Sequence, residues 1–146
     1  MAVRRAEATW EGSLADGSGR TELESGVAPP LDVNWRARTE GGAETSPEEL
    51  LAAAHAACFS MALAHALGEA GNPPQKLSVS AAVEFGPVEG GFAVKTSRLK
   101  VRGVVPGIDE AAFAEAARGA GDGCPISGAL KGNVDISVEA ELAAAD

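Results

Sequence analysis

The stretch "SPEELLAAAHAACFSMALAHAL", residues 46–67, decides the fold of this 146-residue chain. It predicts a helix, because Ser46 is a good N-cap, Pro47 suits the first helical position, and Glu48 and Glu49 favour the positive helix end. The helix is apolar on nearly every side. A helix of this kind must be covered all round, whereas the sheet that one small chain can form covers only one side.

Two arrangements could cover the second side of this helix. The first is another copy of the same helix, which predicts a homodimer with two central helices packed together. The second is a monomer in which the short helices of the chain wrap over the far face. The sequence leaves both open, and we expect the homodimer.

Composition and charge narrow the class of protein. A chain of 146 residues predicts a single domain over residues 1–146. A net charge of −9 argues against sequence-independent binding to nucleic acid and to anionic membranes, which takes clustered Lys and Arg. The apolar run 50–67 is about as long as a membrane span, but it contains two histidines and eight alanines, so we expect a buried core helix. The first residues contain no apolar region typical of a signal peptide, so we expect a cytoplasmic protein.

Alternating and turn-forming residues predict the other elements. Strands are expected over about 3–11, 20–26, 31–36, 76–86, 92–105 and 133–142, and short helices over about 109–120 and 124–132. A polar, glycine-bearing loop is expected at 37–45. The apolar phase of the strand at 92–105 slips, which predicts a bulge near 96–98. This order of elements predicts an α+β fold with antiparallel sheets.

The two cysteines, Cys58 and Cys124, are too few for a disulfide scaffold. They are either buried small hydrophobic residues or a redox pair. The apolar surroundings of Cys58 raise the pKa of a thiol, so Cys58 needs a positive partner to become a thiolate. Cys124 precedes Pro125 and resembles the N-cap of a short helix, where the helix end lowers the pKa of a thiol. Local physics therefore makes Cys124 the easier thiolate.

His55 and Glu48 are the polar candidates on the long helix. His55 lies three residues before Cys58, but it is about 15 Å along the axis from His65, so we expect no metal site and treat His55 as a core histidine or a residue that shapes the pocket. Glu48 is also about 15 Å from Cys58 along the axis. It is either a first-turn carboxylate that favours the helix dipole or, if two central helices pair antiparallel, a residue that reaches the site of the other chain.

The segments "ESGV", "TSPEELLAAAHAACFSMALAHALGEAG", "VPGID" and "GCPISGALKGNV" resemble the OsmC/Ohr family of osmotically induced and organic-hydroperoxide-resistance proteins. The resemblance covers almost the whole chain. It favours the OsmC branch, because the Ohr branch usually has Gly-Tyr where this chain has Ala54–His55. The resemblance implies an intertwined homodimer in which antiparallel sheets wrap around long central apolar helices.

The resemblance also implies an activity, that of a thiol peroxidase which reduces organic hydroperoxides. Cys58 matches the peroxidatic cysteine of the family and Cys124 its resolving cysteine. The oxidised pair would be an intrachain disulfide, restored by a dithiol such as the dihydrolipoyl group of a lipoylated protein, with no bound cofactor. The apolar walls that the helix provides, with Phe59 and Met61, suit alkyl hydroperoxides. The alternatives are a redox sensor and a protein that binds a hydrophobic ligand without turnover.

An arginine completes the site that the resemblance implies, because a guanidinium stabilises a thiolate and donates hydrogen bonds to a peroxide oxygen. The OsmC branch has a stretch similar to "RFEG" before the central helix, and this chain has "RTEG", so Arg38 is the candidate. Thr39 stands where the family usually has Phe. Arg20, in the first hairpin, is the runner-up. The residue that matches Glu48 orients this arginine in the family.

Overall fold

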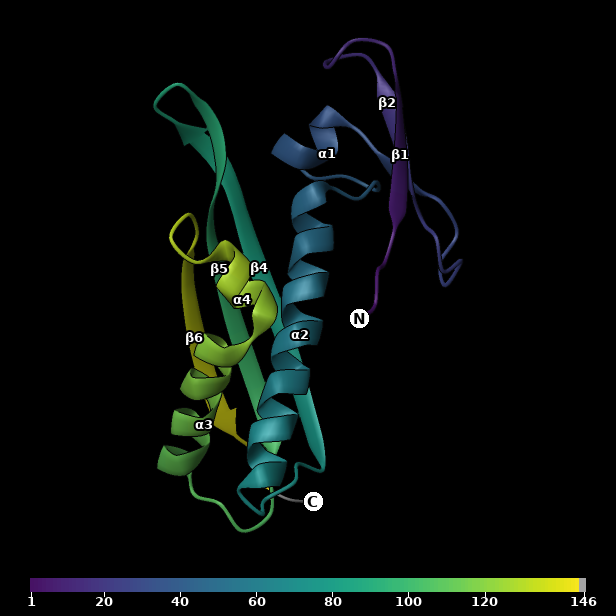
Figure 1. Cartoon of the computed structure of the whole chain (residues 1–146). Helices are drawn as coiled ribbons and strands as arrows, with labels where there is room; N and C mark the ends of the chain where they lie inside the picture. Colours follow the sequence, from purple (N-terminus) through teal and green to yellow (C-terminus); the bar gives the residue numbers. More distant parts are fainter. Residues whose placement is uncertain (145–146) are drawn as a thin grey trace. The chain divides into compact units, whose positions relative to one another are not determined.

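The computed structural model describes residues 1–144 and divides into two compact units (Figure 1). The first unit is Met1–Leu50, and the second begins at Leu51. That they act together as a single domain stays a prediction.

The first unit contains a three-stranded antiparallel sheet of order β1-β2-β3. Its strands are β1 (Ala6–Glu11), β2 (Ser18–Leu23) and β3 (Leu31–Val33). The turn between β1 and β2 is closed by a hydrogen bond from the Gly17 N–H to the Ser13 carbonyl, at 2.8 Å. The predicted hairpin is therefore confirmed, although β1 begins later and β2 earlier than the sequence pattern predicts.

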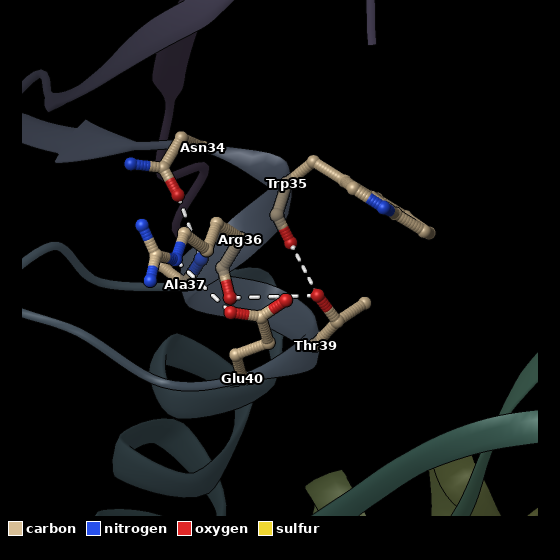
Figure 2. Close-up of polar contacts among 6 residues, drawn as sticks. All are labelled: Asn34, Trp35, Arg36, Ala37, Thr39 and Glu40. Atoms are coloured by element: carbon tan, nitrogen blue, oxygen red, sulfur yellow. Dashed lines mark hydrogen bonds and ion pairs between the residues drawn. The ribbon is translucent and has the colours of Figure 1, made fainter. Parts of the chain in front are cut away.

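A short helix, α1 (Trp35–Thr39), replaces the end of the predicted third strand and the start of the predicted loop. The strand prediction over 31–36 was wrong after Val33, because the side chain of Asn34 caps this helix. Asn34 Oδ1 accepts a hydrogen bond from the Ala37 N–H at 2.6 Å, and Thr39 Oγ1 donates to the Trp35 carbonyl at 3.1 Å (Figure 2). An Asn side chain that satisfies an otherwise unpaired N–H favours helix initiation over strand continuation.

The long helix α2 (Pro47–Glu69) has the predicted bounds and the predicted cap. Ser46 Oγ accepts from the Glu49 N–H at 3.1 Å. Every fourth side chain is fully buried, namely His55, Phe59, Leu63 and Leu67, and the opposite side exposes Ala53, Ala57 and Met61. By length and mean hydropathy, 1.6, α2 passes the test for a membrane span, and 22% of its most apolar window is buried. The expected burial therefore holds for one side of the helix in this chain.

The second unit contains a sheet of order β4-β5-β6, made of β4 (Lys76–Val88), β5 (Gly91–Val104) and β6 (Asp135–Leu142). β4 and β5 pair antiparallel, but β5 and β6 pair parallel. The prediction of antiparallel sheets was therefore wrong for this pair. Parallel neighbours need a long crossover, and here α3 (Glu110–Gly123) and α4 (Pro125–Leu130) supply it between β5 and β6 (Figure 1).

The predicted bulge in β5 exists but lies slightly earlier. Glu84 pairs with Thr96 and Phe85 pairs with Val94, which leaves Lys95 without a partner in the register. The extra residue falls just before the predicted range of 96–98. It explains why the apolar phase of β5 changes along the strand.

The core of the second unit lies between one face of this sheet and helices α2 and α3. Gly103 of β5 makes room for the buried ring of Phe113, since a Cβ at position 103 would lie 2.7 Å from Phe113 Cε2. The other face of the sheet is charged and pairs Lys100 with Glu139 at 2.9 Å. The buried cluster contains Phe59, Leu63, Leu67, Leu99, Val101, Val105, Phe113, Ala117, Ala120 and Cys124. This packing fixes α2 against the segment that joins α3 to α4.

Candidate functional site

The two cysteine side chains meet where α2 lies against the junction of α3 and α4. Cys58 belongs to α2, and Cys124 is both the last cap of α3 and the N-cap of α4. Both are free thiols, Cys58 half-buried and Cys124 buried. The two thiols are hydrogen-bonded to each other. A pair of thiols in contact is the arrangement from which a disulfide forms with little movement.

The surroundings of Cys58 favour its protonated form. Burial is the largest cause that raises the pKa of Cys58, and the hydrogen bond with Cys124 raises it further. The N–H of Ile126 opposes this change. The apolar sequence around Cys58 predicts this upward shift of its pKa.

The pKa of Cys124 is shifted in the opposite direction. Burial raises the pKa of its thiol, but hydrogen bonds from Cys58, from the backbone N–H and hydroxyl of Ser127, and from the N–H of Ile126 outweigh burial and hold the pKa below its usual value. Both N–H groups belong to the first turn of α4, where backbone donors have no partner within the helix. These two directions agree with the prediction that Cys124 is the easier thiolate of the reduced pair. When Cys124 is a thiolate and accepts the S–H of Cys58, the pair carries one proton between two sulfurs.

An apolar hollow of about 530 Å³ opens beside Cys58. Its lining includes Met61, Ala62 and His65 of α2 and Gly119 of α3. Met61 is the wall residue expected from the sequence, whereas Phe59 lies fully buried in the core and forms no part of the lining. The hollow suits a small organic molecule whose reactive end lies against the Cys58 sulfur.

Arg38 and Glu48 form a bidentate ion pair within the first unit. Arg38 Nε lies 3.2 Å from Glu48 Oε2, and Arg38 Nη2 lies 2.8 Å from Glu48 Oε1. The Glu48 side chain is 7% exposed and the Arg38 side chain 32%. Arg20 instead pairs with Asp32 at 3.1 Å on the surface, with both side chains more than half exposed. The carboxylate therefore holds the arginine that the sequence favoured, while the role of both residues at a thiol stays a prediction.

His55 is fully buried with both ring nitrogens in hydrogen bonds. Nδ1 lies 2.7 Å from Ser97 Oγ of β5, and Nε2 lies 2.8 Å from Ser127 Oγ of α4. Burial lowers the pKa of His55, so the ring is neutral near pH 7. Sequence reasoning missed both serines, although Ser127 is recognisable as the residue three after the N-cap Cys124, a position that faces the cap. Among residues 1–144, no three His, Cys, Asp or Glu side chains are grouped as a metal ion would require.

Known proteins with similar sequences and structures share this arrangement of elements. Residues 40–139 match the family model described as OsmC-like protein. The chain is 41% identical over 136 residues to Peroxiredoxin OsmC of Escherichia coli (strain K12), a match that covers 93% of this chain and 95% of that protein. It is 33% identical over 146 residues to the organic hydroperoxide resistance protein OhrB of Bacillus subtilis (strain 168), which covers 95% and 98% of the two chains. The crystal structure of the Bacillus subtilis OhrB superposes with a TM-score of 0.74 and 31% identity over 94% of this chain and 98% of that one.

Proposed function

Because the chain belongs to the OsmC-like protein family, we propose that it reduces organic hydroperoxides to alcohols through the pair Cys58 and Cys124. The relatives are named a peroxiredoxin and an organic hydroperoxide resistance protein, which makes a cysteine-based peroxidase the expected class of enzyme. The observation that supports the proposal best is the direct hydrogen bond between two free thiols beside an apolar hollow.

The chemistry has two steps. The thiolate of Cys58 attacks the terminal oxygen of ROOH, the O–O bond breaks, Cys58 becomes a sulfenic acid, and the alkoxide takes a proton to leave as ROH. The thiolate of Cys124 then attacks the Cys58 sulfur, and the S–O bond breaks. Hydroxide leaves and is protonated to water, and an intrachain disulfide remains. In the sum, two thiols and ROOH give a disulfide, ROH and H₂O.

In this proposal Arg38 stabilises the thiolate of Cys58 and the leaving alkoxide, and Glu48 orients Arg38. The site needs a cation because the pKa of Cys58 is raised. The bidentate contact supports this choice, since it fixes the plane of the guanidinium. Arg20 remains the runner-up.

We further infer a homodimer in the cytoplasm. The exposed apolar side of α2, with Ala53, Ala57 and Met61, supports the covering of one central helix by that of a second copy. In such a dimer Glu48 serves the site of the other chain. Light scattering tests this proposal, because a particle near 14.7 kDa would refute it.

A dithiol restores the reduced pair. We propose a dihydrolipoyl group carried by a partner protein as the reductant, with no bound cofactor. A flexible thiol arm suits the half-buried Cys58, which a folded reductant reaches less easily. Turnover of hydroperoxide with dihydrolipoamide, compared with a single oxidation that is not reversed, separates a peroxidase from a redox sensor.

The test of the activity is the intact mass after one equivalent of an organic hydroperoxide. We expect the loss of two protons, with Cys58 linked to Cys124 in the peptide map, and no such product in Cys58→Ser. Unchanged thiols after treatment would support a protein that only binds a hydrophobic ligand. Undiminished turnover in Cys58→Ser would refute the assignment of the peroxidatic cysteine.

A further inference from the structure

His55 is a buried polar group that the proposed reaction does not use. It connects β5 to α4 through Ser97 and Ser127, and all three side chains are buried. Ser127 in turn contacts Cys124 through its hydroxyl. A continuous line of polar groups therefore runs from Ser97 through the core to the sulfur of Cys124.

The number of protons on each group determines which group donates in each of these hydrogen bonds. A serine hydroxyl has one proton to donate, and a Cys124 thiolate can only accept, so the contact that lowers the pKa of Cys124 has the hydroxyl of Ser127 as its donor when Cys124 is ionised. Ser127 Oγ must then accept from His55, so the proton of the neutral ring is on Nε2. Nδ1 carries no proton and accepts from the hydroxyl of Ser97. Each donor in the line points toward Cys124.

We propose that Ser97, His55 and Ser127 form a directed hydrogen-bond chain that holds Cys124 ready to attack the oxidised Cys58. This inference rests on the proposed function, since it concerns the second step of that reaction. Once Cys58 has become a sulfenic acid, it no longer donates an S–H to Cys124. The Ser127 hydroxyl is then the side-chain donor that still stabilises the attacking thiolate. Ser127 touches the reacting sulfur, whereas His55 and Ser97 are positioning residues that act through it.

Charged groups near Ser127 do not supply this effect by themselves. Arg118, Asp122, Lys131 and Asp135 line a hollow of about 440 Å³ that also borders Ser127. Two of these side chains are cations and two are anions, so their net charge is zero. None of these four charged groups is among the causes of the lowered pKa of Cys124, whereas the hydroxyl of Ser127 is.

The first test is a thiolate titration that needs no peroxide. In a Cys58→Ala background Cys124 is the sole thiol, and since the chain contains no tyrosine its ultraviolet thiolate absorbance is free of tyrosinate overlap. Adding Ser127→Ala should raise the titration midpoint by about one pH unit, the usual effect of losing a hydrogen bond to a charged group. Ser127→Thr should restore it. The matched control is Ser60→Ala on α2, whose hydroxyl donates to the Ala57 carbonyl and which should leave the midpoint unchanged.

The second test follows the reaction with both cysteines present. After one equivalent of cumene hydroperoxide, Ser127→Ala should slow disulfide formation about tenfold and leave sulfenic acid formation unchanged, so that a dimedone adduct accumulates on Cys58. His55→Leu should act in the same direction. Equal slowing of both steps would show a structural effect and overturn the inference.

A third measurement determines the direction of the hydrogen bonds in the chain formed by Ser97, His55 and Ser127. Imidazole nitrogen NMR of the wild-type protein should show the proton of His55 on Nε2. A proton on Nδ1, or a Cys124 midpoint that Ser127→Ala does not move, overturns the inference whatever the peroxidase assay gives. A different result would separate the two proposals. If Ser127→Ala moves the Cys124 titration midpoint but hydroperoxide does not oxidise the thiols, the proposed function is refuted and the hydrogen-bond chain is retained.

Discussion

Replacing Arg38 by Met is the sharpest test of the Arg38–Glu48 ion pair and of the role proposed for it. The change keeps a long apolar stem and removes the guanidinium, so the Glu48 carboxylate loses all three of its contacts with Arg38, at 3.0, 3.2 and 2.8 Å. Because the Glu48 side chain is only 7% exposed, water replaces these donors poorly. We expect a clear loss of free energy of unfolding.

The size of this loss follows from burial. Removing one partner of a fully buried ion pair costs about 3–5 kcal/mol. The Arg38 side chain is 32% exposed, so solvent already screens part of the interaction, and about 2–3 kcal/mol is expected. Arg20→Met is the matched control, because its ion pair with Asp32 is exposed on both sides and should contribute less than about 0.5 kcal/mol.

The assay is equilibrium unfolding in urea at one fixed protein concentration, since self-association would make stability depend on concentration. Adding Glu48→Gln to Arg38→Met removes the stranded charge and should recover about 1–2 kcal/mol. Hydroperoxide turnover should fall in Arg38→Met and remain in Arg20→Met. Equal losses of stability in the two arginine variants, or no recovery in the double variant, would refute the reasoning.

Two further predictions concern packing and protonation. Gly103→Ala should cost about 1–3 kcal/mol because its Cβ meets the Phe113 ring, whereas Gly119→Ala, with open space around it in α3, should stabilise by about 0.5–1 kcal/mol; urea unfolding of both variants checks the difference. Burial lowers the pKa of His55, so the unfolded chain binds a proton near pH 6.5 that the folded chain refuses, and stability should fall as pH drops below about 6.5. His55→Gln should flatten this part of the pH profile, and a profile unchanged by this substitution would contradict the prediction.

The fold was predictable where local signals agreed. Ser46 and Asp109 cap helices as their residue types predict, with Asp109 Oδ1 accepting from the Ala112 N–H at 2.8 Å. The parallel pairing of β5 and β6 was not predictable, because strand patterns record which side chains face the core and not the direction of the neighbouring strand. The helix α1 was missed because a five-residue helix has no apolar period, and its cap, Asn34, is also a common loop residue.

The candidate site, like the fold, was predictable only where local sequence determines it. The signs of the two thiol pKa shifts follow from local sequence, since an apolar helix surrounds Cys58 and a helix start follows Cys124. The contacts of His55 depend instead on β5 and α4, which bring Ser97 and Ser127 to its two nitrogens from 42 and 72 residues away. No pattern in one sequence reports such a meeting of distant segments.

The thiol proposed to attack the peroxide, Cys58, has the raised pKa, and the resolving thiol, Cys124, has the lowered one. Cys58 and Cys124 are in contact, so the pair titrates as a unit, and loss of the second proton is opposed by the charge left by the first. Once the pair has lost one proton, the two sulfurs therefore share the proton that remains. A cation beside Cys58 needs only to move the shared proton to Cys124 to produce the attacking thiolate, which costs less than removing a proton to water. When Cys58 is then oxidised, the leaving alkoxide takes that same proton from Cys124 and departs as ROH. Cys124 is thereby left as the thiolate that attacks the sulfenic acid, and the hydroxide released in that attack is protonated by solvent, so one negative charge serves both steps.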